Sequence, residues 1–503
     1  MSVSWSVQPC LPRSRWLVAI LASSLMAGCA VGPDFKRPAP PEVSQYTAKP
    51  VATTEATEHV AGGDAQRFAT GGDIPGDWWT LFHSAPLNEL IEQSLANNHD
   101  LKAAQAALSV ARENVLAQRG SYYPNVSGSF SASRQRQAGT IAPTPSSNAF
   151  QYNLFTPQVS VSYAPDIFGL NRRTTESVKA QAQAVRYQMI ATQITLSTNV
   201  VAAAVQLASL QAQVDATREL VDINTHMVKI LRDQFAKGYA GGPDLAAQEA
   251  QLAQVNATLP PLLKQLAQQR DLLAVLVGKY PSQAPDLSFD LSKLQLPQEL
   301  PLSLPSTLVA QRPDVLQAEA NMHAASAQIG VAVANRLPNI VLSANAGNTA
   351  LAMNQLFTSG TGFWGIGADI TAPIFQGGTL LHQERAAKAA YVQAAEQYRS
   401  TVMGAFQNVA DSLVALDQDA AGLKAAAAAE EASRRSLDLA QRQSQAGYAN
   451  YLSLLSAEQS YQQARITLVQ AQASRYADTA ALFQALGGGW WNRADLARDN
   501  DEK

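Results

Sequence analysis

The sequence predicts a mixed fold, built from two internal repeats, that combines a long α-helical barrel with a transmembrane β-barrel. Three observations predict it. Landmarks of the first half recur in the second, four segments alternate apolar with small or polar residues, and two segments of 67 and 68 residues are almost free of proline and glycine. Each chain would supply four strands, and the three chains of a trimer would supply twelve.

The repeat is visible in landmarks that recur in the same order. Residues 97–126 align without gaps on residues 311–340, an offset of 214. Two further pairs follow at offsets of 208 and 209: Ala164-Pro165 with Ala372-Pro373, and Gly238-Tyr239-Ala240 with Gly447-Tyr448-Ala449. A repeat this long indicates a duplicated half-protein and not a short solenoid.

Each repeat contains two segments with a period of two residues. In residues 126–133 and 159–163, apolar side chains alternate with serine. In residues 340–346 and 364–371, they alternate with serine, asparagine, glycine, aspartate or threonine. One apolar and one polar face are typical of a transmembrane strand beside a wet interior. Two soluble hairpins packed on a core are the alternative, but the targeting segment described below favours the membrane.

Long helices are predicted for most of the remaining sequence. Residues 169–235 and 378–445 would each form a helix of about 100 Å at 1.5 Å per residue. Shorter helices are predicted for residues 87–122, 244–277, 305–336 and 451–486. A long coiled coil is the alternative. However, alanine dominates the contact positions, and small residues allow helices to pack closely in a wall.

Four strands per chain predict an oligomer. Known transmembrane barrels begin at about eight strands, so one chain cannot close a barrel by itself. An open sheet edge cannot lie in lipid, because its N–H and C=O groups would have no partner. We therefore expect a homotrimer, in which the long helices form a tube projecting away from the membrane.

Composition and charge exclude several other classes of protein. The chain has 37 Lys and Arg against 40 Asp and Glu, and this near balance argues against a nucleic-acid partner. The only cysteines are Cys10 and Cys29, so a disulfide framework or a cysteine zinc site is excluded. The histidines are scattered and no nucleophile or phosphate-loop motif occurs. We therefore expect no catalytic residues, no metal and no cofactor; a periplasmic lipoprotein enzyme and a coiled-coil scaffold are the alternatives.

Residues 1–28 are predicted to be a lipoprotein signal peptide. Arg13 and Arg15 precede an apolar run of about 12 residues, too short to span a bilayer. Small residues before Cys29 resemble a bacterial lipoprotein cleavage site, which would make Cys29 the acylated first residue of the mature chain. Ala30 follows where inner-membrane lipoproteins often have aspartate, which favours the outer membrane. An ordinary signal peptide is the alternative.

These landmarks resemble the trimeric outer membrane factors of bacterial tripartite RND efflux systems, in their lipoprotein, nodulation-type branch. The motifs that carry the resemblance are residues 29–38, Asp77-Trp78-Trp79 with Leu81-Phe82, the two Pro-Asn turns, residues 164–169 and 372–377, the two Gly-Tyr-Ala turns, and residues 485–490. The resemblance implies a passive exit duct with a periplasmic adaptor protein, an inner-membrane RND-type pump and outer membrane lipid as partners. The exit duct of a type I protein secretion system is the alternative.

The resemblance also divides the chain into five parts. Residues 1–28 are the signal peptide and 29–75 a lipidated N-terminal extension. Residues 76–296 are the first repeat, 297–491 the second repeat and 492–503 a C-terminal tail. An equatorial belt around the tube would include residues 281–300 and the C-terminal end.

The resemblance places the working residues at the turns between long and returning helices. It implies that the adaptor docks on these tips, at Gly238, Tyr239, Gly447 and Tyr448. It implies a periplasmic gate just inside the tips, at Leu452, Ser456 and Asp244. Relatives often carry an acidic residue where this chain has Ser456. We therefore expect closure to depend on a ring of Leu452 with Asp244 rather than on a salt bridge; plain helix caps and helix packing are the alternatives.

Overall fold

The computed structural model describes residues 30–136, 151–284, 289–446 and 451–497, which belong to two compact units. Unit 1 comprises Met1–Arg37, Ser109–Ala184 and Glu319–Gln397. Unit 2 comprises Pro38–Leu108, Val185–Ala318 and Tyr398–Lys503. Each unit draws on both halves of the sequence. Four helices contribute residues to both units: α3 His99–Arg119, α4 Leu170–Ala236, α7 Pro313–Ala334 and α8 Thr379–Gln445. The boundaries inferred from the sequence run along the chain instead and remain a prediction.

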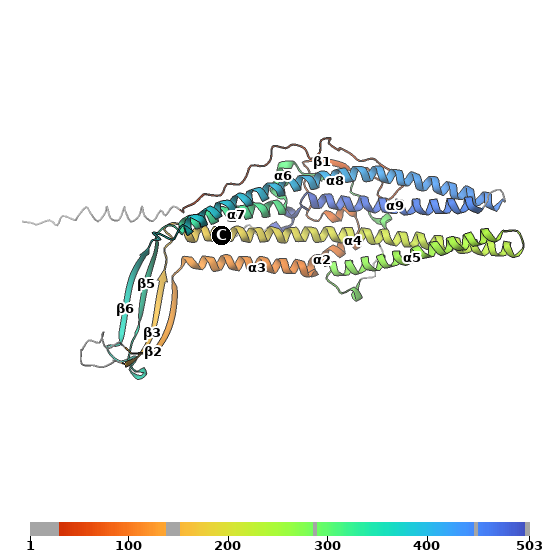
Figure 1. Ribbon diagram of the computed structural model, residues 1–503. Coiled ribbons are helices and arrows are strands. Elements are labelled where there is room, and N and C mark those ends of the chain that lie inside the picture. The colour runs from red at the N-terminus through yellow and green to blue at the C-terminus, as the bar shows by residue number, and fades with distance from the viewer. Residues whose placement is uncertain (1–29, 137–150, 285–288, 447–450, 498–503) are drawn as a thin grey trace, which may run out of the picture. The chain divides into compact units, whose positions relative to one another are not determined.

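Unit 1 contains a four-stranded antiparallel sheet in the order β2-β3-β5-β6 (Figure 1). Its strands are β2 Asn125–Arg136, β3 Gln151–Tyr163, β5 Asn339–Asn348 and β6 Gly362–Thr371. Each strand covers one of the four segments whose alternation predicts it. The β-domain and the mostly helical remainder confirm the mixed fold class, whereas closure into a barrel remains a proposal.

The register of the sheet gives it one polar and one apolar face. Opposite one another across the four strands lie Ser127, Ser160, Asn345 and Gly365, and the Ser127 and Ser160 hydroxyls are 3.0 Å apart. The neighbouring row, on the other face, contains Val126, Val161, Ala344 and Ile366. Large apolar side chains of this second face are exposed: Val126, Phe130, Val159, Trp364, Ile366 and Ile370. The sheet is therefore amphipathic, with an apolar face that the described residues leave exposed.

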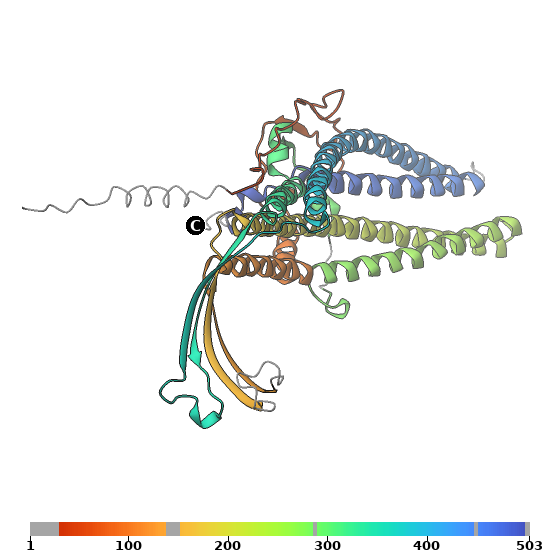
Figure 2. The same cartoon turned by 60° about the vertical axis from the view of Figure 1, so that its left-hand side comes forward.

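Two helices of 67 residues each, α4 Leu170–Ala236 and α8 Thr379–Gln445, confirm the predicted long helices. Each is followed by a helix of 35 residues, α5 Gly242–Leu276 and α9 Tyr451–Ala485. Within unit 2, α5 lies beside α4 (Figure 2). An 18-residue stretch of α4 is apolar enough to cross a membrane by composition, but 67% of it is buried inside the protein. Burial of this kind is usual for the core helix of a soluble domain.

The prediction of single helices over residues 87–122 and 305–336 is wrong, since each segment forms two helices. They are α2 Ala85–Asn97 with α3 His99–Arg119, and α6 Pro305–Gln311 with α7 Pro313–Ala334. Asn98 interrupts the first pair, because its side-chain oxygen caps α3 by accepting from the N–H groups of Asp100 (2.9 Å) and Leu101 (3.0 Å). Arg312 interrupts the second pair, because a residue before proline is forced into extended backbone.

Short elements complete unit 2 around an aromatic core. A two-stranded parallel sheet, which the sequence did not predict, pairs β1 Arg67–Thr70 with β4 Glu299–Leu302. The Trp78 and Phe483 rings stack at 5.1 Å, and both side chains are fully buried. The remaining short helices are η1 Trp78–Phe82, η2 Gly120–Tyr122 (in unit 1), η3 Pro281–Gln283, η4 Leu291–Lys293, η5 Met353–Gln355 (in unit 1), η6 Trp490–Asn492 and α10 Ala494–Ala497.

The cap at Asn98 yields a stability prediction. The side chain of Asn98 is buried and also donates to the carbonyl of Leu276 at 3.1 Å. Asn98→Ala should lower the free energy of unfolding by about 1–2 kcal/mol, because it removes a helix cap and leaves buried groups unpaired. Thermal unfolding followed by circular dichroism measures this. The neighbouring Asn97 is exposed, so Asn97→Ala is the control; equal melting temperatures for the two variants would contradict the assignment of the cap.

Candidate functional site: the strand sheet and the helix tips

The sheet of unit 1 ends on each side at a strand with a free edge. In the part of the chain that the structure describes, β2 pairs only with β3, and β6 pairs only with β5. Such an edge presents unpaired N–H and C=O groups that can bond to another strand. The free edges and the exposed apolar face together make this sheet incomplete as an isolated chain.

The first tip is closed by its own backbone. Tyr239 N–H donates to the carbonyl of Gln234 (2.8 Å) and Gly238 N–H to that of Phe235 (3.0 Å), the pattern of a Schellman motif. Gly238 has φ +76°, which side-chain-bearing residues rarely adopt, and a methyl group added there would meet nothing within 4 Å. The side chain of Tyr239 is 82% exposed. The turn is thus rigid in its backbone and open on its surface.

Helices α4 and α5 are joined side by side behind this tip. Arg232 forms an ion pair with Glu249 at 2.7 Å, and the buried Gln248 amide donates to Asn224 at 2.9 Å. The ion pair is exposed and contributes little, whereas the buried amide pair fixes the register of the two helices. Asp244 lies in the first turn of α5, where its negative charge favours the helix N-terminus, and it is exposed.

Several residues predicted from the sequence lie outside what the structure describes. Cys29, Gly447 and Tyr448 belong to the undescribed residues, and of Leu452 only the backbone, in the first turn of α9, is described. Ser456 is exposed. No described hydrogen bond or ion pair joins Asp244 to Ser456. The gate and docking roles of these residues therefore stay predictions.

Helices α8 and α9 pack on each other near the second tip. Their shared core consists of Leu437, Ala440, Leu454 and Ala457, with Met227 and Tyr461 packed against it. One turn along α9, the Gln459 amide donates to Gln251 of α5 at 2.8 Å. This amide contact places α5 and α9 beside each other within unit 2.

A buried carboxylic acid, Glu458, lies next to this core. Its residue is 3% exposed, and its Oε1 has no hydrogen-bond partner among the described residues. Burial alone raises the pKa of Glu458 to about 7, because a desolvated carboxylate is unfavourable. The sequence alone does not single out Glu458, because its burial depends on tertiary packing. The one indication in the sequence is that Glu458 lies two residues after the predicted gate residue Ser456.

No group of three or more metal-ligating side chains occurs in the described residues. What the geometry offers instead is an amphipathic sheet and two long helices, each packed beside a shorter returning helix, which are the features of a membrane channel component. A family model described as outer membrane efflux protein matches residues 90–279 and 304–488. The chain belongs to this family, and it is an outer-membrane component of an efflux pump.

Individual relatives cover nearly the whole chain. The toluene efflux pump outer membrane protein TtgC of Pseudomonas putida is 29% identical over 475 residues, which are 94% of this chain and 95% of the relative. The pyoverdine export outer membrane protein OpmQ of Pseudomonas aeruginosa is 29% identical over 428 residues, 84% and 89% of the two chains. The solved outer-membrane channel OprN superposes with a TM-score of 0.81 at 26% identity, covering 92% of this chain and 100% of OprN. These relatives do not favour a protein secretion duct.

Because of Glu458, the stability of the folded protein should decrease as the pH rises. Its folded-state pKa of about 7 exceeds the ordinary value of 4.5, so the folded protein retains a proton that the unfolded chain has lost. The stabilisation is complete below pH 4.5 and is lost as the pH rises through 7, a change on the order of 3 kcal/mol. Glu458→Gln should therefore stabilise the protein against heat at pH 8 but not at pH 4.

The control for this measurement is Glu431→Gln, because Glu431 is an exposed glutamate on α8. It should follow the wild-type melting curve at both pH values. If Glu458→Gln and wild type show the same pH dependence, Glu458 does not carry a buried proton.

Proposed function

We propose that three chains assemble into one passive exit duct for small molecules, gated at its periplasmic end. The observation that carries the proposal is the two-faced sheet with two free edges. In lipid, every backbone polar group must be paired within the protein. Three copies of a four-stranded sheet, joined edge to edge, satisfy both edges of each sheet and give twelve strands, enough for a water-filled lumen.

The face assignments support this arrangement. The exposed apolar row from Val126 to Ile366 would meet lipid, and the row of serine and asparagine around Ser160 would line water. A lumen lined by small neutral polar side chains selects little among solutes. The relatives named for toluene efflux and pyoverdine export fit a duct whose cargo is chosen elsewhere, by an inner-membrane RND-type pump and a periplasmic adaptor.

The finer assignments belong to the same proposal. Acylation at Cys29 anchors the lipidated extension of residues 29–75 in the outer membrane. Residues 76–296 and 297–491 are two copies of one ancestral unit. Gly238, Tyr239, Gly447 and Tyr448 form the surface on which the adaptor docks, and Leu452, Ser456 and Asp244 surround the constriction.

The decisive experiment is conductance of the purified protein in a planar bilayer. Crosslinking in detergent should first give a trimer, and the wild-type channel should conduct weakly because its tip is closed. Burial of one leucine side chain contributes about 1.5–3 kcal/mol. Leu452→Ser should therefore raise conductance about tenfold or more, since each 1.4 kcal/mol changes an equilibrium about tenfold. It should also make cells sensitive to large antibiotics.

Asp244→Asn is the paired variant. It should reduce cation selectivity with a smaller effect on closure, because it removes charge without removing apolar packing. A monodisperse monomer, or a trimer that never conducts, would overturn the channel proposal. A conducting trimer in which Leu452→Ser changes neither conductance nor antibiotic entry would move the constriction elsewhere.

The docking surface yields a separate prediction. Gly238→Glu places a bulky charge on the open turn of the first tip, so it should block adaptor docking and abolish efflux-dependent drug resistance at a normal trimer level. Gly360→Glu is a matched control. Gly360 also has a positive φ, of +89°, and a methyl group added there also meets nothing within 4 Å, but it lies between β5 and β6. Equal resistance in the two variants would mean that the tip is only a helix cap.

A further inference from the structure

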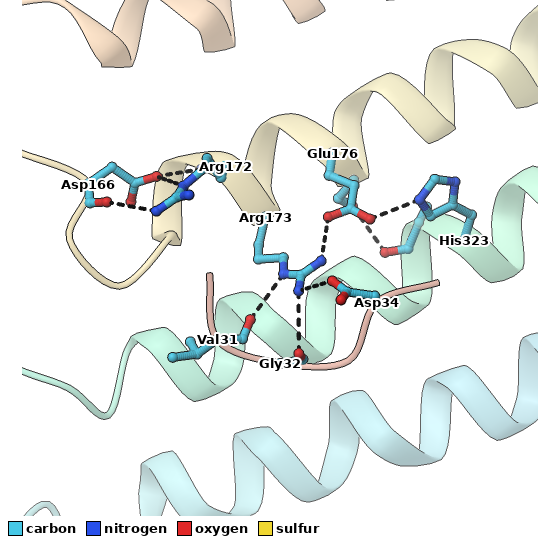
Figure 3. A network of polar contacts seen from close by, with 10 residues as sticks. Val31, Gly32, Asp34, Asp166, Arg172, Arg173, Glu176 and His323 are labelled. Atoms are coloured by element: carbon cyan, nitrogen blue, oxygen red, sulfur yellow. Dashed lines mark hydrogen bonds and ion pairs between the residues drawn. The ribbon is translucent and has the colours of Figure 1, made fainter. Parts of the chain in front are cut away.

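Residues 30–37, the described N-terminal segment of unit 1, pack against helices α4 and α7. Arg173, near the start of α4, is 4% exposed and supplies four hydrogen bonds (Figure 3). They run to the carbonyl of Val31 (Nε, 3.0 Å), the carbonyl of Gly32 (Nη2, 3.3 Å), Asp34 (Nη2, 2.8 Å) and Glu176 (Nη1, 2.8 Å). One buried guanidinium, with five donors, thus holds three positions of the segment.

Where the segment crosses α7, its backbone lies directly against the backbone of the helix, at Gly32 and Gly330. Gly32 has φ +94°, and a methyl group added to it would come within 3.0 Å of Cα of Gly330. A methyl group added to Gly330 would lie 2.7 Å from Cγ of Arg173 and 2.9 Å from the carbonyl oxygen of Val31. Only glycine at both positions permits this approach.

The segment then follows one face of α7. Phe35 stacks on His323 with ring centroids 4.4 Å apart, and Arg37 pairs with Glu319 at 2.9 Å. Gly330, His323 and Glu319 are spaced by seven and four residues, so they share one helix face. Eleven helical residues rise about 17 Å, and five extended residues span about 17 Å, so positions 32 to 37 match positions 330 to 319 in length.

A second polar pair secures the surface behind Arg173. His323 Nε2 lies 2.9 Å from Oε1 of Glu176, whose other oxygen accepts from Arg173. The carboxylate of Asp34 is 89% exposed, so its ion pair with Arg173 contributes little to binding the segment. The hydrogen bonds from Arg173 to the carbonyls of Val31 and Gly32 contribute most of it. We name Arg173, Glu176, His323 and Gly330 the N-terminal clamp.

The clamp fixes the segment at the junction between strand and helix. Val31 N–H donates to the carbonyl of Phe168 at 3.1 Å, and a methyl group added to Gly169 would lie 2.7 Å from Cα of Ala30. Phe168 and Gly169 lie between the end of β3 at Tyr163 and the start of α4 at Leu170. After β6, at the same end of the sheet, Ile374 and Phe375 are 92% and 87% exposed, as expected of side chains that meet lipid.

We propose that the N-terminal clamp is a positioning device that holds the mature N-terminus in one register, so that acyl chains on the preceding residue enter the membrane beside the end of β3. This inference rests on the proposed acylation of Cys29, the residue that precedes Ala30 in the sequence. The partner is the lipid leaflet at that end of the sheet.

The first test uses trypsin on full-length, membrane-extracted trimer. The exposed Lys36 is the cleavage site, and it lies between the two side chains that bind α7. Cleavage there requires local release of the segment. Gly32→Ala should raise the cleavage rate about tenfold, because opening the segment becomes easier. Gly71→Ala is the matched control: Gly71 also has a positive φ, of +80°, but an added methyl group meets nothing within 4 Å.

Phe35→Ala, which removes only the ring stacked on His323, should also speed cleavage and guards against a Gly32 variant that fails to assemble. Arg173→Lys keeps the positive charge but loses the forked contacts of the guanidinium. Trypsin should therefore cleave this variant faster than wild type as well. Cleavage of Gly32→Ala and Phe35→Ala at the wild-type rate would overturn the clamp.

The second test follows the lipid itself. Cells are grown with a photoactivatable fatty acid, and its crosslinks to the protein are mapped by mass spectrometry. In wild type they should concentrate on residues 163–168 and 371–375, and in Gly32→Ala they should spread. Absence of label from wild type would reject acylation while the trypsin result still decides the clamp. Label with the same crosslink pattern in both proteins would reject the role of the clamp in placing the anchor.

Discussion

The hydrogen-bonding demand of the peptide backbone is the constraint on which the rest of this molecule depends. A membrane interior supplies no partner for an N–H or C=O group, so a sheet that ends at β2 and β6 is not a finished structure there. The consequence runs through the whole chain. In the proposed trimer, the strands pair with copies of themselves, and the same symmetry would bring together the helices that continue from them, so that one interface would organise both the membrane and the periplasmic parts.

Local sequence patterns predicted the regular elements well. The alternation around Phe130 and Ile366 located the strands, and the scarcity of proline and glycine located the two helices of 67 residues. The breaks at Asn98 and Arg312 were missed, because one depends on a side chain capping the next helix and the other on the residue that follows it. Hydrophobic periodicity is unchanged across either break, so it carried no signal.

Polar contacts between residues far apart in the chain could not be predicted from the sequence. The sequence does not distinguish Glu458 from an ordinary helix glutamate, and only the packing of α8 and α9 around it makes it unusual. Arg173 and His323 are separated by 150 residues, and nothing in either neighbourhood pairs them. Glu176 joins them in the structure. Motif resemblance, by contrast, named positions at the tips and the gate whose roles rest on assembly with other chains.

The Schellman turn at Gly238 has a consequence for the proposed docking of an adaptor. Its two internal hydrogen bonds fix the backbone before anything binds, so association there orders little more than the ring of Tyr239. Recognition of a preformed main-chain surface depends on the conformation of one glycine more than on the identity of its neighbours. If the adaptor docks here as proposed, such a surface favours interchangeability: one duct could serve several adaptors, and the neighbouring side chains would be free to vary without loss of fit.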